Sequence, residues 1–329
     1  MTFKKLKNYI VLLITITFIM PQTLLAYSSK IIAGGESIGI EIKNKGIIVA
    51  GFYKVGNKYP GVLANLQKGD TIINVNNTSV NSIVNFIEMI KNDDDKILDI
   101  TYKRNNKKYE TNLELIEDDN TIKTGLYVKD TVSGIGTLSF IDPKTKLYGA
   151  LGHEVNESTS GVKLDVKEGS IYTSSVNNIE KSLRGEPGSK KATTDFNNSV
   201  GNIKENTISG IFGTYTNEFN KDKLYNVASY KDIKLSNAKI ITVLNGTKKQ
   251  EYDIKILSVN NDKKDNKNIL FEITDNELIK KTGGIVQGMS GSPITQNDNI
   301  IGAVTNVVVN DPKKGYAILI TTMLEEAEN

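Results

Sequence analysis

The stretch of sequence that organises the chain is Gly283-Gly284-Ile285-Val286-Gln287-Gly288-Met289-Ser290-Gly291-Ser292-Pro293-Ile294. Glycines on both sides of Ser290 predict a tight turn that exposes its hydroxyl, as a nucleophile requires. Gly288 has no side chain to cover its backbone N–H, so the N–H groups of Gly288 and Ser290 are predicted to point together at the oxygen of an attacked carbonyl. The same residue types also suit an ordinary turn between two strands.

A serine nucleophile needs a general base, and the composition offers one candidate. His153 is the only histidine among 329 residues, and it follows the small-residue stretch Tyr148-Gly149-Ala150-Leu151-Gly152. A packing or surface role is the alternative for such a histidine. Ser292 stands where the G-x-S-x-G elbow of α/β-hydrolases has its last glycine, so that class is disfavoured. The pattern Gly-x-Ser-Gly-x-Pro is instead that of chymotrypsin-like peptidases.

The composition excludes several classes of site. The 41 basic and 38 acidic residues are spread along the chain and give a net charge of +3, so nucleic acid is not an expected partner. A chain with no cysteine and one histidine forms neither disulfides nor a thiolate or multi-histidine metal centre. The acidic runs at 93–95 and 117–119 are interpreted as solvated loops rather than calcium ligands. No metal and no other cofactor is expected.

Residues 1–30 predict an export signal or a membrane anchor. Three lysines within the first seven residues precede an apolar run from Tyr9 to Met20, an order typical of a segment whose basic end stays in the cytoplasm. The segment from Tyr9 to Ala26 is about long enough to cross a bilayer, whereas cleavage after Ala26 is disfavoured by the size of Leu24. We therefore expect the rest of the chain to be exported and either tethered to the membrane or slowly released.

Residues 31–117 predict a small α+β domain. A short helix is expected over 60–66, a strand over 71–76, and a helix over 79–90 whose apolar residues recur at helical spacing. This order resembles a PDZ domain. In that resemblance Ser37, Ile38, Gly39 and Ile40 form the loop that binds a peptide carboxylate, while the peptide adds a strand to the sheet edge. The alternative is that Gly39 only permits a turn and the chain's own residues fill the groove.

Residues 118–329 predict a mainly β domain. Short β-type segments alternate with Gly, Asn, Asp and Pro, and the turn at Asn245-Gly246 between apolar runs is a strong hairpin signal. Two chymotrypsin-like β-barrels, with the site in the cleft between them, accommodate both this pattern and the wide separation of His153 from Ser290. The strand expected over 300–305 then lies beside the cleft and pairs with substrate backbone.

Several short pieces, in order and spacing, resemble the stage IV sporulation protein B family, which are membrane-tethered, PDZ-containing serine peptidases of endospore formers. The resemblance extends from about Ile31 to Leu324, and the pieces are Ser37–Ile40, Tyr148–His153, Thr282–Ile294, Val309–Pro312 and Gly315–Tyr316. It implies that Ser290 is the nucleophile and His153 the general base.

The resemblance places the third catalytic residue, a carboxylate that orients the histidine, at Asp275. This position is close to Ser290, whereas the acid of chymotrypsin lies well upstream, so Asp195 and Asp232 stay open as alternatives. Met289 precedes the nucleophile where digestive relatives carry an aspartate that pairs with a newly cut N-terminus. That route of zymogen activation is therefore absent.

The resemblance also implies a role in signalling. The enzyme would act in the space between the forespore and mother-cell membranes on a regulator that restrains an intramembrane metalloprotease, so that a late sigma-factor precursor matures. Self-cleavage and control through the PDZ domain are implied as well. Two alternatives stay open: an envelope quality-control protease with many unfolded substrates, and a PDZ adaptor whose peptidase-like domain is inert.

Overall fold

The computed structural model describes residues 27–92, 94–262 and 264–328, and it is mainly β. The predicted N-terminal export segment lies outside the described residues. Within them, no helix is long and apolar enough to cross a membrane. The helices are α2 (Pro60–Leu63), α3 (Ile83–Lys91), α4 (Asn276–Thr282) and α5 (Ile320–Ala327), with a 3-10 helix η1 (Tyr230–Asp232).

The strands follow in chain order. They are β1 (Lys30–Ala33), β2 (Ser37–Phe52), β3 (Thr71–Val75), β4 (Thr78–Ser79), β5 (Ile97–Arg104), β6 (Lys107–Glu114), β7 (Ile116–Asp118), β8 (Thr121–Lys123), β9 (Leu126–Ile141), β10 (Leu147–Ala150), β11 (Val166–Glu180), β12 (Ser189–Asn202), β13 (Glu205–Thr207), β14 (Gly210–Thr214), β15 (Tyr225–Val227), β16 (Asn237–Val243), β17 (Lys249–Val259), β18 (Ile269–Ile273), β19 (Pro293–Gln296), β20 (Asn299–Val307) and β21 (Lys314–Leu319).

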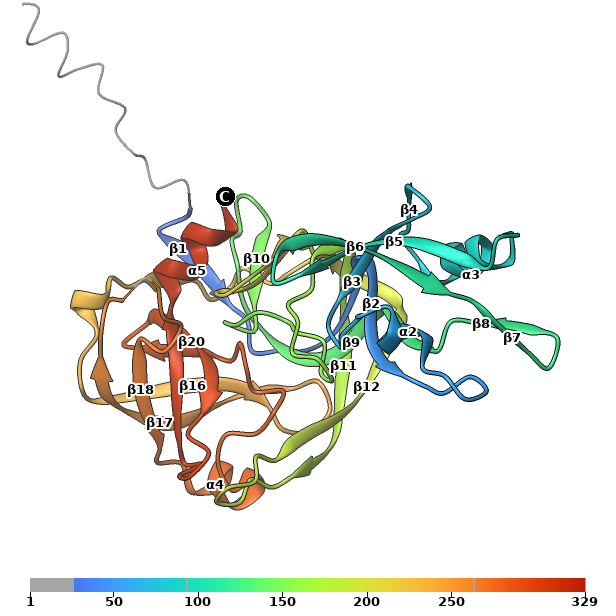
Figure 1. Ribbon diagram of the computed structural model, residues 1–329. Coiled ribbons are helices and arrows are strands. Elements are labelled where there is room, and N and C mark those ends of the chain that lie inside the picture. The colour runs from blue at the N-terminus through green and yellow to red at the C-terminus, as the bar shows by residue number, and fades with distance from the viewer. Residues whose placement is uncertain (1–26, 93, 263, 329) are drawn as a thin grey trace, which may run out of the picture.

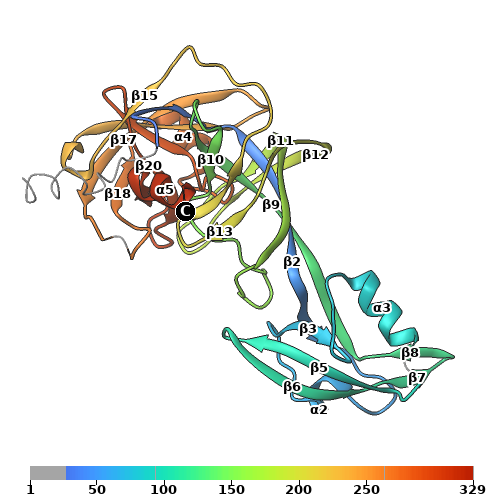
Figure 2. The ribbon, with the colours of Figure 1, turned by 90° about the horizontal axis from the view of Figure 1, so that it is seen from above.

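Strands β2 and β9, each 16 residues long, connect the two parts of the molecule. They pair antiparallel from Ser37↔Thr137 to Lys43↔Thr131, and the pairing resumes at Ile48↔Lys129. Figure 2 shows this two-stranded ribbon leaving the larger part of the molecule and entering the smaller domain, which carries α2 and α3. The smaller domain is therefore inserted between two strands of one barrel.

This topology changes both limits expected for the smaller domain, residues 31 and 117, since its core also includes Leu126 of β9. Ile38, Ile40 and Ile42 of β2 are buried in one core with Leu138 of β9, so residues 31–43 belong to the first barrel. Asn44 is buried and accepts a hydrogen bond from the N–H of Asp165, at the point where β2 passes from one domain to the other.

The same topology overturns the expected peptide-carboxylate loop. Ser37, Ile38, Gly39 and Ile40 are buried within β2, which pairs with β9 on one side and with β11 on the other. A Cβ at Gly39 would lie 2.1 Å from the Thr194 side chain, so this glycine permits close packing rather than a loop. Backbone groups shared between two strands are not free to bind a peptide terminus.

The smaller domain has its own core under both predicted helices. Ser82 caps α3 by accepting a hydrogen bond from the N–H of Asn85, so the helix starts four residues later than the sequence suggests. Its buried residues Phe86 and Ile90 pack with apolar residues of β3, β5 and β6, including Ile72, Leu98 and Leu113. The PDZ-like α+β arrangement predicted from the sequence is confirmed apart from its limits.

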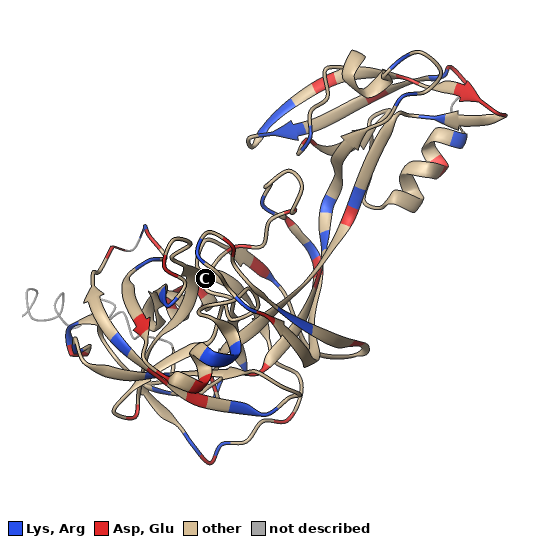
Figure 3. Ribbon diagram, turned by 90° about the horizontal axis from the view of Figure 1, so that it is seen from below, with Lys and Arg blue, Asp and Glu red and all other residues tan. Residues whose placement is uncertain are grey.

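The larger part of the molecule, in which β16, β17, β18 and β20 lie together in Figure 1, has two β-barrel cores and an apolar layer between them. The first core gathers apolar residues of β2, β9, β10, β11 and β14, and the second those of β16 to β21. Helix α5 covers the junction with its buried face, which includes Met323 and Leu324. The hairpin predicted around Asn245-Gly246 is confirmed as β16–β17. Charged residues of both signs are interspersed over the elements in Figure 3.

Candidate active site

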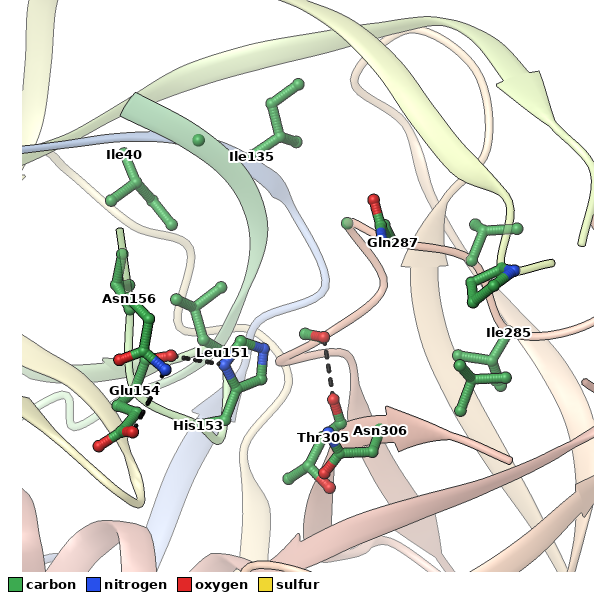
Figure 4. Close-up of a pocket in the computed structure, with 17 residues that line it drawn as sticks. Ile40, Ile135, Leu151, His153, Glu154, Asn156, Ile285, Gln287, Thr305 and Asn306 are labelled. Carbon is green, nitrogen blue, oxygen red and sulfur yellow. Dashed lines mark hydrogen bonds between the residues drawn. The ribbon is translucent and has the colours of Figure 1, made fainter. Parts of the chain in front are cut away.

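His153 and Ser290 line one cavity of about 420 Å³, so the structure brings the two predicted residues together. The first barrel contributes Ile40, Ile135 and the segment after β10, and the second contributes the loop before Ser290 and the end of β20. Figure 4 shows His153 and Thr305 among the residues that line this cavity.

A sharp turn at the end of β10 presents His153. Leu151 and Gly152 both adopt the left-handed conformation, with φ of 71° and 70°. Such a conformation is unfavourable for leucine and is typical of residues that a functional site constrains. The carbonyl of Gly152 accepts a hydrogen bond from the Asn266 side chain at 3.4 Å, and Leu151 is buried, so the turn is held from both barrels.

The hydrogen bond of the ring determines which nitrogen can act as a base. Nδ1 of His153 lies 2.8 Å from the carbonyl oxygen of Glu154. A carbonyl oxygen only accepts, so the neutral ring carries its proton on Nδ1 and leaves the lone pair of Nε2 free. The Glu154 carboxylate is turned toward Asn156 instead of the ring (Figure 4).

The hydroxyl of Ser290 is half-buried and donates to the carbonyl of Thr305 at 3.0 Å. No hydrogen bond joins it to His153 among the described residues, so the pair is in a resting geometry. Catalytic hydrogen bonds commonly tighten only when substrate binds. A rotation of the Ser290 side chain away from Thr305 would break this hydrogen bond and free the hydroxyl.

The two predicted oxyanion donors are free. The N–H groups of Gly288 and Ser290 donate to no acceptor among the described residues. The carbonyl of Gln287, which precedes the Gly288 N–H, is held by the N–H of Lys190 at 2.9 Å. Because a peptide plane carries its C=O and N–H on opposite sides, this bond keeps the Gln287 carbonyl out of the space where an oxyanion would form.

Asp275 does not lie at the site, and its predicted role as the third catalytic residue is wrong for this geometry. Its carboxylate caps α4 by accepting a hydrogen bond from the N–H of Leu278 at 2.9 Å, and it does not line the cavity. The signal that mapped it, an Asp eight residues before Gly-Gly, is a helix cap followed by a glycine C-cap at Gly283. The alternatives also fail, since Asp195 bonds Asn197 and Asn198, and Asp232 bonds Ser229.

A buried lysine beside the loop was not anticipated. Lys190 is 4% exposed, packs against Gly288, and donates from Nζ to the hydroxyl of Thr242 at 2.8 Å. Burial lowers the pKa of Lys190 to about 7. Its charged neighbours in the sequence, Lys191 above all, suggest an exposed strand face and hide this position.

The described residues contain no group of three His, Asp or Glu side chains placed to hold a metal ion. The cavity presents a hydroxyl, an imidazole with a free Nε2, and two backbone N–H groups that are unpaired among the described residues.

Comparison with known proteins identifies the family. A profile described as SpoIVB peptidase S55 matches residues 120–324, which is more than half of the chain. The chain belongs to this family. The chain is a chymotrypsin-like serine peptidase with a smaller α+β domain inserted in its first barrel. The family match begins after β2, although β1 and the first half of β2 complete the first barrel.

Solved structures give weaker likenesses to this chain. The PDZ domain of an SdrC-like protein from Listeria monocytogenes is 23% identical over 27% of this chain and 93% of its own, with a TM-score of 0.23. The inactive form of the Rv3671c protease is 11% identical over 59% of this chain and 85% of its own, with a TM-score of 0.34. A Ser-to-Ala mutant of that protease, from M. tuberculosis, is 12% identical over 59% and 82%, with a TM-score of 0.31. No curated protein matches the chain.

Proposed function

We propose that this chain is an exported serine endopeptidase that works with a Ser290–His153 pair. Nε2 of His153 takes the proton of the Ser290 hydroxyl while the oxygen attacks a substrate carbonyl carbon. The resulting oxyanion accepts hydrogen bonds from the N–H groups of Gly288 and Ser290. The imidazolium then gives its proton to the leaving amine, and the acyl group stays on Ser290 as an ester. Water attacks this ester while His153 takes its proton, and the proton returns to Ser290 as the carboxylic acid leaves.

The carbonyl of Glu154 takes the place of a triad carboxylate. It fixes the tautomer and orientation of His153, which is one of the two contributions that a triad aspartate makes. The other contribution, a full negative charge beside the imidazolium, is absent, since no carboxylate contacts the ring among the described residues. The reaction therefore relies more heavily on the two oxyanion donors.

The observation that carries this proposal is the meeting of His153 and Ser290 in one cavity beside two unpaired N–H groups. A fluorophosphonate probe, which reacts with activated serines, tests it. We expect labelling of the wild type and of Ser292→Ala, a matched change two residues further on, and no labelling of Ser290→Ala or His153→Ala. Equal labelling of Ser290→Ala and wild type would contradict the assignment.

We further propose that the substrate is a protein of the sporulation pathway, with self-cleavage as a second reaction. Membership of the SpoIVB peptidase family supports a signalling role, and the basic and apolar N-terminal sequence supports export with a membrane tether. The proposed compartment is the space between the forespore and mother-cell membranes, and the proposed substrate is a regulator of an intramembrane metalloprotease.

Complementation tests this role. In an endospore former that lacks its own family member, wild-type protein should restore late sigma-factor processing and Ser290→Ala should not. Restoration by Ser290→Ala would show an adaptor role, and cleavage of many unfolded proteins by the wild type would show a quality-control role. A reporter enzyme fused after residue 30 should be active only when exported.

Peptide docking by the PDZ-like domain is proposed at the outer edge of β9. Residues 126–133 of β9 pair with β2 on one side only, and Asp130 accepts a hydrogen bond from the N–H of Ile83 at the start of α3. Tyr127 and Val84 are 59% and 68% exposed. The edge of β9 to which a peptide strand would be added begins directly after Gly125, which has φ of 69°. This edge replaces the peptide-binding position expected at Ser37–Ile40. Tyr127→Glu should weaken binding of a peptide selected on the wild-type domain.

A further inference from the structure

The loop that carries the oxyanion donors is held through its carbonyl groups. Four consecutive carbonyls, from Gln287 to Ser290, each accept a hydrogen bond. Three of the four donors are backbone N–H groups, of Lys190, Ser292 and Thr137. The fourth is a side chain, because the hydroxyl of Thr137 donates to the carbonyl of Gly288 at 2.7 Å.

Thr137 therefore binds this loop twice. Its N–H donates to the carbonyl of Ser290 at 3.0 Å, and its hydroxyl holds the carbonyl two residues earlier. The residue is fully buried in β9, with 0% of its surface exposed. A Cβ at Gly291 would lie 2.0 Å from the Thr137 carbonyl, so the loop and the strand are in the closest contact that a backbone permits.

Thr137 also contacts the segment that presents the base. Its carbonyl accepts a hydrogen bond from the N–H of Leu151 at 3.3 Å, two residues before His153. One residue thus connects the nucleophile loop of the second barrel with the histidine turn of the first. Its position in the run Gly134-Ile135-Gly136-Thr137, where small residues allow close approach, is the sequence signal for this contact.

We propose that Thr137 is a positioning residue that keeps the oxyanion hole open. Among the described residues, its hydroxyl is the only side-chain group that donates a hydrogen bond to the backbone of the loop 287–290. Gly288 has φ of 91°, a conformation from which a glycine can leave easily because it has no Cβ. Without the Thr137 hydroxyl, the half-buried Gly288 carbonyl loses its donor. Rotation of the adjoining peptide planes would then turn the Gly288 N–H out of line.

The test separates transition-state stabilisation from substrate binding. The full-length enzyme, purified in mild detergent, is assayed with the best-cleaved peptide of a fluorogenic library, and inhibited by the matching peptide aldehyde and peptide alcohol. The aldehyde forms an oxyanion with Ser290, whereas the alcohol fills the same subsites without one. Thr137→Val, which keeps the shape and removes the donor, should lower kcat about 10- to 100-fold and weaken the aldehyde by a similar factor. KM and the Ki of the alcohol should stay within about twofold.

Two variants provide controls. Thr137→Ser keeps the hydroxyl and should restore kcat to within a few-fold of wild type. Ser139 lies on the same strand, and its buried hydroxyl has no hydrogen-bond partner among the described residues. Ser139→Ala should therefore leave kcat and both inhibition constants unchanged. Equal loss of aldehyde and alcohol binding in a folded Thr137→Val would overturn the inference, as would unchanged kcat. If Thr137→Val does not fold, Thr137→Cys replaces it, since a thiol is a poor donor; activity equal to that of Thr137→Ser would then overturn the inference.

This inference rests on the proposed nucleophile, and the variants distinguish the two. Full activity in Ser290→Ala would refute both. Loss of activity in Ser290→Ala together with a neutral Thr137→Val would refute only the role of Thr137.

Discussion

Replacing Lys190 by methionine should remove a large pH dependence of stability. In the unfolded chain the lysine has its ordinary pKa of 10.5, whereas burial lowers the pKa to about 7 in the folded protein. Between these values the unfolded chain holds one proton more than the folded one, so the free energy of unfolding rises with pH. At about 1.4 kcal/mol per pKa unit, the whole shift corresponds to on the order of 5 kcal/mol. Below pH 7 the free energy of unfolding is lower by this amount.

The measurement is urea unfolding of the Ser290→Ala protein, which cannot digest itself. From pH 7 to pH 9 the difference between this protein and Ser290→Ala/Lys190→Met should change by about 2 kcal/mol, with the methionine variant relatively more stable at pH 7. Lys191→Met is the matched control, because Lys191 is exposed on the same strand and pairs with Glu180. A difference between the two proteins that stays the same from pH 7 to pH 9 would refute the reasoning, since the lysine would then keep its proton in the folded state.

Three further predictions concern other parts of the chain. Asp275→Asn should keep the α4 cap and should have activity within a few-fold of wild type, whereas Asp275→Ala should lose about 1 kcal/mol of stability. A loss of kcat of about 10⁴-fold in Asp275→Asn would instead show that Asp275 is the catalytic acid. Burial alone would raise the pKa of Glu157, but its bonds to Lys129, Ser160 and nearby N–H groups lower the pKa to about 2. Glu157→Gln should therefore lower the free energy of unfolding at pH 7, and the difference from wild type should shrink as the pH falls from 4.5 toward 2. A difference that does not change with pH would contradict this role of the carboxylate. Joining Lys43 to Thr131 through an Asn-Gly turn should leave a folded peptidase by circular dichroism, whereas residues 118–329 alone, which lack β1 and β2, should not fold; a cooperative unfolding transition in that fragment would disprove the insertion.

The sequence predicts the catalytic residues of the site better than the arrangement of strands that positions them. The glycines around Ser290 and the uniqueness of His153 are local properties, so both residues and both oxyanion donors could be named in advance. The family match supports the class of peptidase, and the cavity shows the two side chains together. Their roles stay predictions until the variants are measured.

The insertion could not be read from the sequence, because strand pairing over about 90 residues leaves no local pattern. Ser37–Ile40 alternates as any strand does, and its resemblance to a peptide-binding loop disappears only when β9 and β11 are placed beside it. Asp275 misleads for a related reason. An aspartate before a short amphipathic segment is equally typical of a helix cap and of a catalytic acid, and only the position of α4 separates the two.

The insertion also has a consequence for the order in which the chain folds. β2 must wait for β9 before the first barrel can close, and a flexible loop of such length would make this closure slow and entropically costly. The smaller domain has its own core and can form first, and its folding brings the far ends of β2 and β9 together. The nascent barrel then needs to close only a short hairpin, so the inserted domain acts as a folding template for the enzyme around it.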